Sequence, residues 1–170
     1  GLISGDVQSG KTSTYIGFIC KAADAGYKVF ILLTGTIESL RQQTQERVEE
    51  GFIGIDMSAN TTGGKRVGVG LDNKPIHAMA LTSRASDFRG NSDKIAVSLG
   101  ADKDAVVFVI KKNTTTLTKL TKWLIDLNAD PRTHKIDMPM LMIDDEADNA
   151  SINTSSDKED PTKINKLIRK

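Results

Sequence analysis

The stretch GDVQSGKT, residues 5–12, decides which fold this chain is expected to adopt. The apolar run GLIS before it predicts the end of a β-strand, and apolar residues after it recur at helical spacing until Gly26. A strand, a glycine-rich turn and a helix in this order are typical of a phosphate-binding loop with the pattern G-x-x-x-x-G-K-[ST], the Walker A motif. The fixed positions of the pattern are Gly5, Gly10, Lys11 and Thr12.

The residue types of this stretch suit the binding of a nucleotide's phosphates. Glycines allow backbone angles that turn successive N–H groups toward one point, and the positive end of the following helix adds to the field. The ammonium group of Lys11 can contact the β- and γ-phosphates, and the hydroxyl of Thr12 can coordinate Mg²⁺. A glycine turn that only caps a helix is the alternative interpretation. The predicted nucleotide-binding residues are Gly5, Asp6, Val7, Gln8, Ser9, Gly10, Lys11, Thr12 and Ser13.

Beyond this loop, apolar runs alternate with segments that have helical spacing. Strands are predicted at residues 28–34, 76–82, 105–111 and 140–144. Helices are predicted at residues 38–50 and 115–128 and from Pro161 onward, and a small hairpin is predicted around RVGVGLDN, residues 66–73, within the glycine-rich stretch 51–75. This alternation indicates an α/β fold, a three-layer sandwich in which helices cover both faces of a mainly parallel sheet. Ligands of such sheets bind at the carboxyl ends of the strands, where the phosphate loop is expected.

A second polar motif follows the last predicted strand, in the stretch LMIDDEAD at residues 141–148. Its carboxylates are expected beside the phosphate loop, because parallel strands end at one edge of the sheet. We predict that Asp145 holds Mg²⁺, as a Walker B aspartate does, and that Glu146 is the base that orients and deprotonates the attacking water. A solvated acidic loop is the alternative interpretation.

Composition excludes several classes of protein. The chain has 170 residues, of which 38% are hydrophobic and 26% charged, values typical of one globular domain and not of a disordered chain. The net charge of +1 means that any binding of nucleic acid would need a local patch. A single cysteine, no signal peptide and no membrane-spanning run predict a cytoplasmic protein. His77 and Trp123 are predicted to be core residues and not ligands.

Together these stretches resemble a known family. Residues 5–52 contain GDVQSGKTST and LRQQTQER, residues 140–154 contain IDDEADNAS, and both blocks are similar to the Z-one domain family of bacterial helicase-like ATPases. That family is associated with restriction and phage-defence genes and is similar to superfamily-two helicases of the DEAD-box type. The resemblance implies a RecA-like lobe that binds ATP and Mg²⁺ and acts on DNA as a helicase or translocase. It also implies that Lys11 and Glu146 are catalytic.

The resemblance further implies what this chain works with. Residues 1–170 are expected to form a single ATP-binding lobe excised from a longer protein, which supplies a second RecA-like lobe with an arginine finger. The isolated lobe would hydrolyse ATP poorly, because an arginine finger is worth roughly 10³–10⁵ in rate. DNA and other restriction or defence proteins are the expected partners, and a membrane is not.

Polar residues near other predicted strand ends are, by the same resemblance, candidates for contact with the nucleic-acid backbone. They can supply hydroxyl, backbone N–H or cationic groups to phosphates without reading bases. The candidates are Thr34, Gly35, Arg41, Thr82, Ser83, Arg84 and Lys112. Ordinary polar residues at strand ends are the alternative interpretation.

Two other functions fit parts of the sequence. A phosphotransferase would share the phosphate loop, but it would need an acceptor pocket and usually an arginine-bearing lid. A metal-dependent nuclease would use Asp144, Asp145 and Glu146 directly, and it would cleave DNA with Mg²⁺ in the absence of ATP. Stimulation of ATP hydrolysis by DNA would separate a helicase-like ATPase from the phosphotransferase, and a nuclease would be insensitive to Lys11→Ala.

Overall fold

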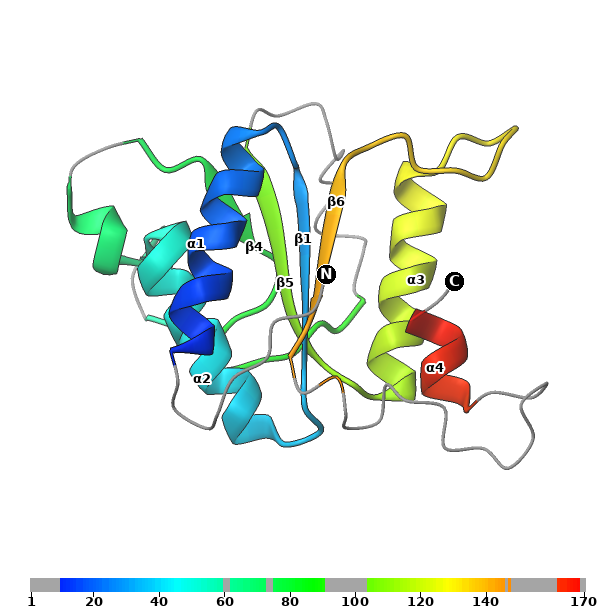
Figure 1. Cartoon of the computed structure of the whole chain (residues 1–170), viewed down its shortest axis with the longest axis horizontal. Coiled ribbons are helices and arrows are strands. Elements are labelled where there is room, and N and C mark those ends of the chain that lie inside the picture. Colours follow the sequence, from blue (N-terminus) through cyan, green and yellow to red (C-terminus); the bar gives the residue numbers. More distant parts are fainter. Residues whose placement is uncertain are drawn as a thin grey trace.

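The central element of the fold is a parallel sheet. A computed structural model describes residues 10–59, 62–72, 75–90, 104–145, 147 and 162–168. These residues contain a sheet of four parallel strands in the order β4-β5-β1-β6 (Figure 1). The strands are β1 (Val29–Thr34), β4 (Ala78–Ala80), β5 (Ala105–Lys111) and β6 (Met140–Asp144). The predicted parallel sheet is confirmed, with β5 and β6 at their predicted bounds; the strand predicted before the phosphate loop lies outside the described residues.

Helices cover both faces of this sheet, so the described part of the chain is a three-layer α/β structure (Figure 1). On one face lie α1 (Lys11–Asp24) and α2 (Glu38–Val48), and on the other lie α3 (Thr114–Asn128) and α4 (Lys163–Ile168). The start of α3 is capped by Asn113, whose side chain accepts hydrogen bonds from two backbone N–H groups of the first turn. No helix in the described ranges combines the length and the apolar character that a bilayer span requires.

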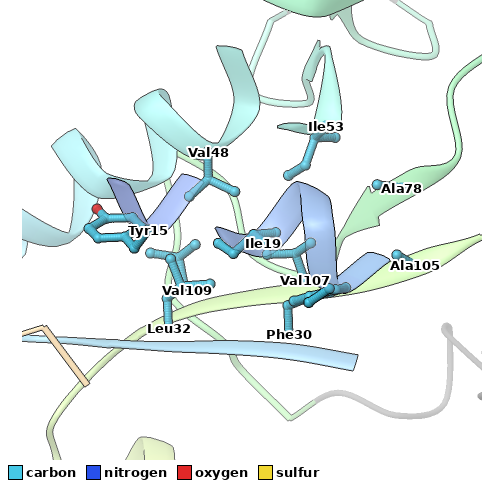
Figure 2. Close-up of a cluster of buried hydrophobic side chains, with 11 residues drawn as sticks. Tyr15, Ile19, Phe30, Leu32, Val48, Ile53, Ala78, Ala105, Val107 and Val109 are labelled. Carbon is cyan, nitrogen blue, oxygen red and sulfur yellow. The ribbon is translucent and has the colours of Figure 1, made fainter. Parts of the chain in front are cut away.

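The core consists of two layers of apolar side chains, one on each face of the sheet. Every residue of β1 is buried, as expected for a strand with neighbours on both sides and helices on both faces. Phe30 and Leu32 point toward α1 and α2 (Figure 2), whereas Ile31 and Leu33 belong to the layer beneath α3. Each such side chain contributes roughly 1.5–3 kcal/mol when fully buried. The alternation along β1 therefore holds the three layers together.

Trp123 lies in the layer beneath α3, as the helical spacing predicted. Its indole packs edge-on against Phe88 and Phe108, with ring centroids 6.0 Å and 5.4 Å away. Edge-to-face pairs at this distance add to the stabilisation that burial provides. The prediction that Trp123 is a core residue is confirmed.

The chain after α2 differs in detail from the prediction. Spacing predicts a helix that ends before Gly51, but a π-helical turn, Glu49–Ile53, continues it to Gly54, whose φ is +82°. A hairpin does form in this stretch, from β2 (Ile55–Asp56) and β3 (Lys65–Arg66). The hairpin predicted around residues 66–73 is wrong, because a short 3₁₀ helix covers Gly68–Asp72 there. Gly54 and Gly70 touch backbone to backbone, with no room for a side chain at Gly70. This contact between distant residues is a tertiary feature that local spacing does not reveal.

His77 is not the packed core histidine that the sequence predicts. Its side chain is 72% exposed, and Nδ1 lies 3.4 Å from Oδ1 of Asp104. The physical reason is the length of β4, which covers only Ala78–Ala80 and leaves His77 before the strand, at the amino-terminal edge of the sheet.

Candidate functional site

The carboxyl edge of the sheet is where the candidate site lies. The strands β1, β5 and β6 all end at this edge, and α1 begins there (Figure 1). This arrangement follows from the parallel strand pairing, because each strand returns in the same direction. Binding sites of parallel α/β sheets are found at this edge.

The start of α1 follows directly on a glycine with left-handed backbone angles. Gly10 has a left-handed backbone, with φ +80° and ψ +16°, and the helix begins at the next residue. Among the described residues, no side chain caps this end, and the first turn contains no acidic residue. The first N–H groups of a helix have no partner within the helix, and together with the helix dipole they favour a negatively charged ligand.

Part of the predicted phosphate loop lies outside the description. Residues 5–9, which include Gly5, Asp6, Val7, Gln8 and Ser9, belong to this part, as do the side chains of Lys11 and Thr12. Ser13 is exposed on the first turn of α1. The predicted glycine turn leading directly into a helix is thus seen from Gly10 onward.

The last residues of β6 separate the two adjacent aspartates. Leu141 and Ile143 pack against the core layer beneath α1, whereas Met140 packs against the layer beneath α3. Side chains alternate along a strand, so Asp144 lies on the α3 side. The backbone N–H of Asp145 donates to the carbonyl of Leu33 at 2.8 Å, which continues the ladder between β1 and β6 by one residue. The same alternation places Asp145 on the α1 side, where α1 begins.

The residues at this edge fit a Mg²⁺ ion held together with a nucleotide. Among the described residues, no group of three histidine, cysteine or acidic side chains could hold a metal by itself. Mg²⁺ in phosphate-binding sites needs fewer protein ligands, because one or two side chains share the ion with phosphates and waters. The half-buried Asp145 supplies such a carboxylate on the side where α1 begins. Thr12 remains the predicted second ligand, and the predicted base Glu146 lies outside the described residues.

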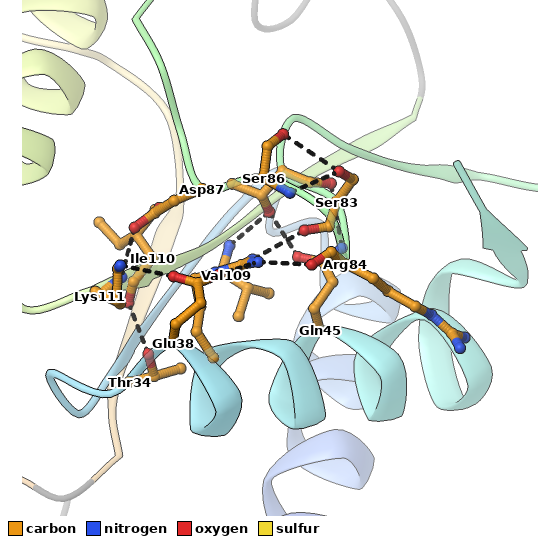
Figure 3. Close-up of polar contacts among 12 residues, drawn as sticks. Thr34, Glu38, Gln45, Ser83, Arg84, Ser86, Asp87, Val109, Ile110 and Lys111 are labelled. Carbon is orange, nitrogen blue, oxygen red and sulfur yellow. Dashed lines mark hydrogen bonds and ion pairs between the residues drawn. The ribbon is translucent and has the colours of Figure 1, made fainter. Parts of the chain in front are cut away.

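Most of the side chains predicted to contact nucleic acid have partners within the protein (Figure 3). The hydroxyl of Thr34 donates to the carbonyl of Ile110 at 3.1 Å. The hydroxyl of Thr82 donates to Oε1 of Gln45 at 2.8 Å and accepts from the N–H of Val109 at 3.0 Å. Buried polar groups that are satisfied in this way stabilise the fold. Their hydroxyls serve the packing of the strand ends in this structure.

Arg41 is also directed inward. Its side chain is fully buried, and Nε donates to Oε1 of Glu38 at 2.8 Å. The two terminal nitrogens donate to the carbonyl oxygens of Ser83 and Arg84 at 2.9 Å and 3.0 Å. Arg41 therefore fastens the loop after β4 to α2, and its guanidinium is already occupied.

Arg84 lies among carboxylates from α2, the π-helical turn and β2. Its guanidinium lies 2.6 Å from Glu49 and 2.7 Å from Glu46, with Asp56 at 3.6 Å. Burial raises the pKa of Glu49, and hydrogen bonds from Arg84 and Gln45 offset only part of that rise. An arginine whose charge is balanced in this way has little left to attract a phosphate.

The remaining nucleic-acid candidates lie around the same strand ends. Gly35 is buried, Ser83 is half-buried, and Lys112 is fully buried. Contact of this edge with DNA stays a prediction. The groups left for such contact are backbone groups and the exposed parts of the loops.

Sequence reasoning missed the residues of α2 that organise this region. Gln45 donates from Nε2 to Glu49 Oε1 at 2.8 Å and to the Thr82 carbonyl at 3.2 Å. Oε2 of Glu38 forms an ion pair with Nζ of Lys111, at a distance of 2.6 Å. The spacing of Glu38, Arg41, Gln45 and Glu49 along one helical face was the available signal. A polar helix face suggested solvent, whereas much of this face is buried.

Comparisons with family models, with curated proteins and with solved structures found no match to this chain.

Proposed function

We propose that this chain is the ATP-binding, RecA-like lobe of a helicase or translocase ATPase that acts on DNA, in a bacterial restriction or phage-defence system. The observation that carries the proposal is the meeting of two features at one edge of a parallel sheet. α1 begins directly after Gly10, with no side-chain cap from the residues that the structure describes, and Asp145 leaves β6 on the same side of the sheet. The GKT and DEAD letters occur at these two places.

In the proposed mechanism the chain supplies positioning and charge. The N–H groups at the start of α1 and the ammonium of Lys11 hold the β- and γ-phosphates. Thr12 and Asp145 would hold Mg²⁺, which when bound offsets the negative charge on the phosphates. Glu146 orients the attacking water and accepts its proton.

Nucleotide binding is the first test of the proposal. A fluorescent ATP analogue is titrated against the wild type and Lys11→Ala, with Lys21→Ala as the matched control. Lys21 is an exposed lysine in the last turn of the same helix, far from the phosphate end. We expect Lys11→Ala to abolish measurable binding and Lys21→Ala to bind like the wild type. Equal binding by all three proteins would contradict the assignment of the phosphate loop.

The choice of reaction needs a second measurement, made in the longest form of the protein that hydrolyses ATP. We expect single- or double-stranded DNA to stimulate hydrolysis and Glu146→Gln to stop it while leaving nucleotide binding intact. Cleavage of DNA with Mg²⁺ and without ATP, unaffected by Lys11→Ala, would instead indicate a nuclease. Transfer of phosphate to a small molecule would indicate a phosphotransferase.

A further inference from the structure

A buried ion pair joins two strands that are not neighbours in the sheet. Lys112 directly follows β5, and its side chain is fully buried. Its Nζ lies 2.6 Å from Oδ1 of Asp144, the last residue of β6. Because β1 lies between β5 and β6, the ion pair bridges the end of β1.

Both partners of this ion pair are also tied to β1 through their backbones. The N–H of Lys112 lies 3.3 Å from the carbonyl of Thr34 and 3.4 Å from that of Gly35. On the other side, the residue after Asp144 donates its N–H to Leu33. The ends of the three strands are thereby fixed relative to one another at the edge where the candidate site lies.

Stability alone does not account for such an ion pair. Removing a lysine and a carboxylate from water carries a large desolvation penalty, so apolar residues would often serve the packing equally well. The ion pair does, however, affect which aspartate can meet a cation at the candidate site. Asp144 and Asp145 are adjacent carboxylates at the end of one strand, and either could compete for a cation. Lys112 neutralises the first and holds it on the α3 side, away from the start of α1.

We propose that Lys112 is a positioning residue that retains Asp144 on the α3 side and so leaves Asp145 as the carboxylate presented to Mg²⁺. This inference rests on the proposed function, because it concerns the Mg²⁺ of a bound nucleotide. It also gives Lys112 a role other than the contact with nucleic acid that the sequence suggests.

The test is the Mg²⁺ dependence of nucleotide binding, which requires no catalytic turnover. Affinity for a fluorescent ATP analogue is measured in EDTA and across a Mg²⁺ titration, below the unfolding temperature of each variant. Lys112→Met should raise the Mg²⁺ concentration that gives half of the maximal gain in nucleotide affinity by about 10–100-fold, the range typical of residues that set a metal's coordination without binding the metal. The affinity in EDTA should stay at the wild-type value, since Lys112 is paired with Asp144 on the α3 side of the sheet, whereas α1 covers the other side.

Removing both charges should reverse the effect. In Lys112→Met/Asp144→Asn the carboxylate of Asp144 is removed together with its partner, and the Mg²⁺ requirement should return most of the way to the wild-type value. Lys122→Met, an exposed lysine on α3, is the matched control and should not change the requirement. If Lys112→Met does not fold, Lys112→Gln retains a donor for Asp144 and should show a smaller rise in the same direction.

Two outcomes separate this inference from the proposed function. If Asp145→Asn raises the Mg²⁺ requirement and the folded Lys112 variants do not, Lys112 is only structural and the inference is wrong. If the wild type binds no nucleotide, or Mg²⁺ has no effect on its binding, the proposed function fails and the inference fails with it.

Discussion

The carboxyl edge of the sheet has two halves that are built in opposite ways. Beside α1, no side chain in the described part of the protein caps the start of the helix, and Asp145 lies on the same side of the sheet. Beside α2, the side chains of Arg41, Gln45 and Thr82 are buried and paired with one another or with the backbone. The first half leaves hydrogen-bonding capacity for a ligand, whereas the second uses its capacity to hold the loop after β4 in place. Polar residues at strand ends therefore do not all indicate binding.

The largest effect is expected from Arg41→Met, which removes the link between α2 and the loop after β4. The carbonyl groups of Ser83 and Arg84 lose their donors. Because each buried group left unpaired costs about 1–3 kcal/mol, we expect the free energy of unfolding to fall by about 3 kcal/mol. Urea denaturation measures it. Gln42→Ala, at an exposed position of the same helix, is the control and should change stability by less than about 0.5 kcal/mol.

The same variant sharpens the comparison between the two halves. Nucleotide affinity of folded Arg41→Met should match the wild type, because the guanidinium of Arg41 is hydrogen-bonded to Glu38 and to the loop after β4. A loss of nucleotide binding as large as that of Lys11→Ala would show that the two halves do not act separately.

A smaller effect is expected from Thr82→Val, which keeps the shape of the side chain and removes the hydroxyl. Gln45 then loses a donor and the N–H of Val109 loses an acceptor, so the free energy of unfolding should fall by about 1–2 kcal/mol. Thermal or urea denaturation measures the change. Thr115→Val at an exposed position in the first turn of α3 is the control, and an equal loss there would contradict the role of the buried hydroxyl.

The smallest effect concerns pH and Asp87, which lies in the loop after β4 and accepts hydrogen bonds from the N–H groups of Phe88 and Lys111. Burial raises the pKa of Asp87 above its ordinary value of 3.8, although hydrogen bonds from the N–H groups of Phe88 and Lys111 oppose the rise. The folded protein thus holds this proton more tightly than the unfolded chain, and the stability that results is lost as pH rises through the folded pKa. Between pH 4 and pH 7, the stability of Asp87→Asn should therefore improve relative to the wild type. A constant difference in urea denaturation across this range would show that Asp87 titrates normally.

Local sequence patterns were sufficient for the elements whose environment is simple. β5 and β6 have their predicted bounds, and β1 and α3 each differ from the predicted bounds by one residue at the amino end. Such elements are predictable because a strand buried on both faces must be continuously apolar and an amphipathic helix must repeat its apolar face. The chain after α2 could not be predicted in the same way, since the contact between Gly54 and Gly70 joins residues far apart in sequence. The prediction for His77 was wrong for a related reason, because apolar neighbours in sequence do not show where a strand starts.

By itself, the sequence determined the parallel α/β arrangement, the helix after the glycine turn and the acidic residues at the end of β6. These features depend on local periodicity and backbone preference, which a short stretch contains in full. Only the tertiary structure decided which polar side chains face a ligand and which face the protein. It placed Asp144 with Lys112 on one side of the sheet and Asp145 on the other, and it buried Arg41 against the loop after β4. The physical reason is that the partner of a polar group is set by strand order and helix packing, which bring together residues that the sequence keeps apart.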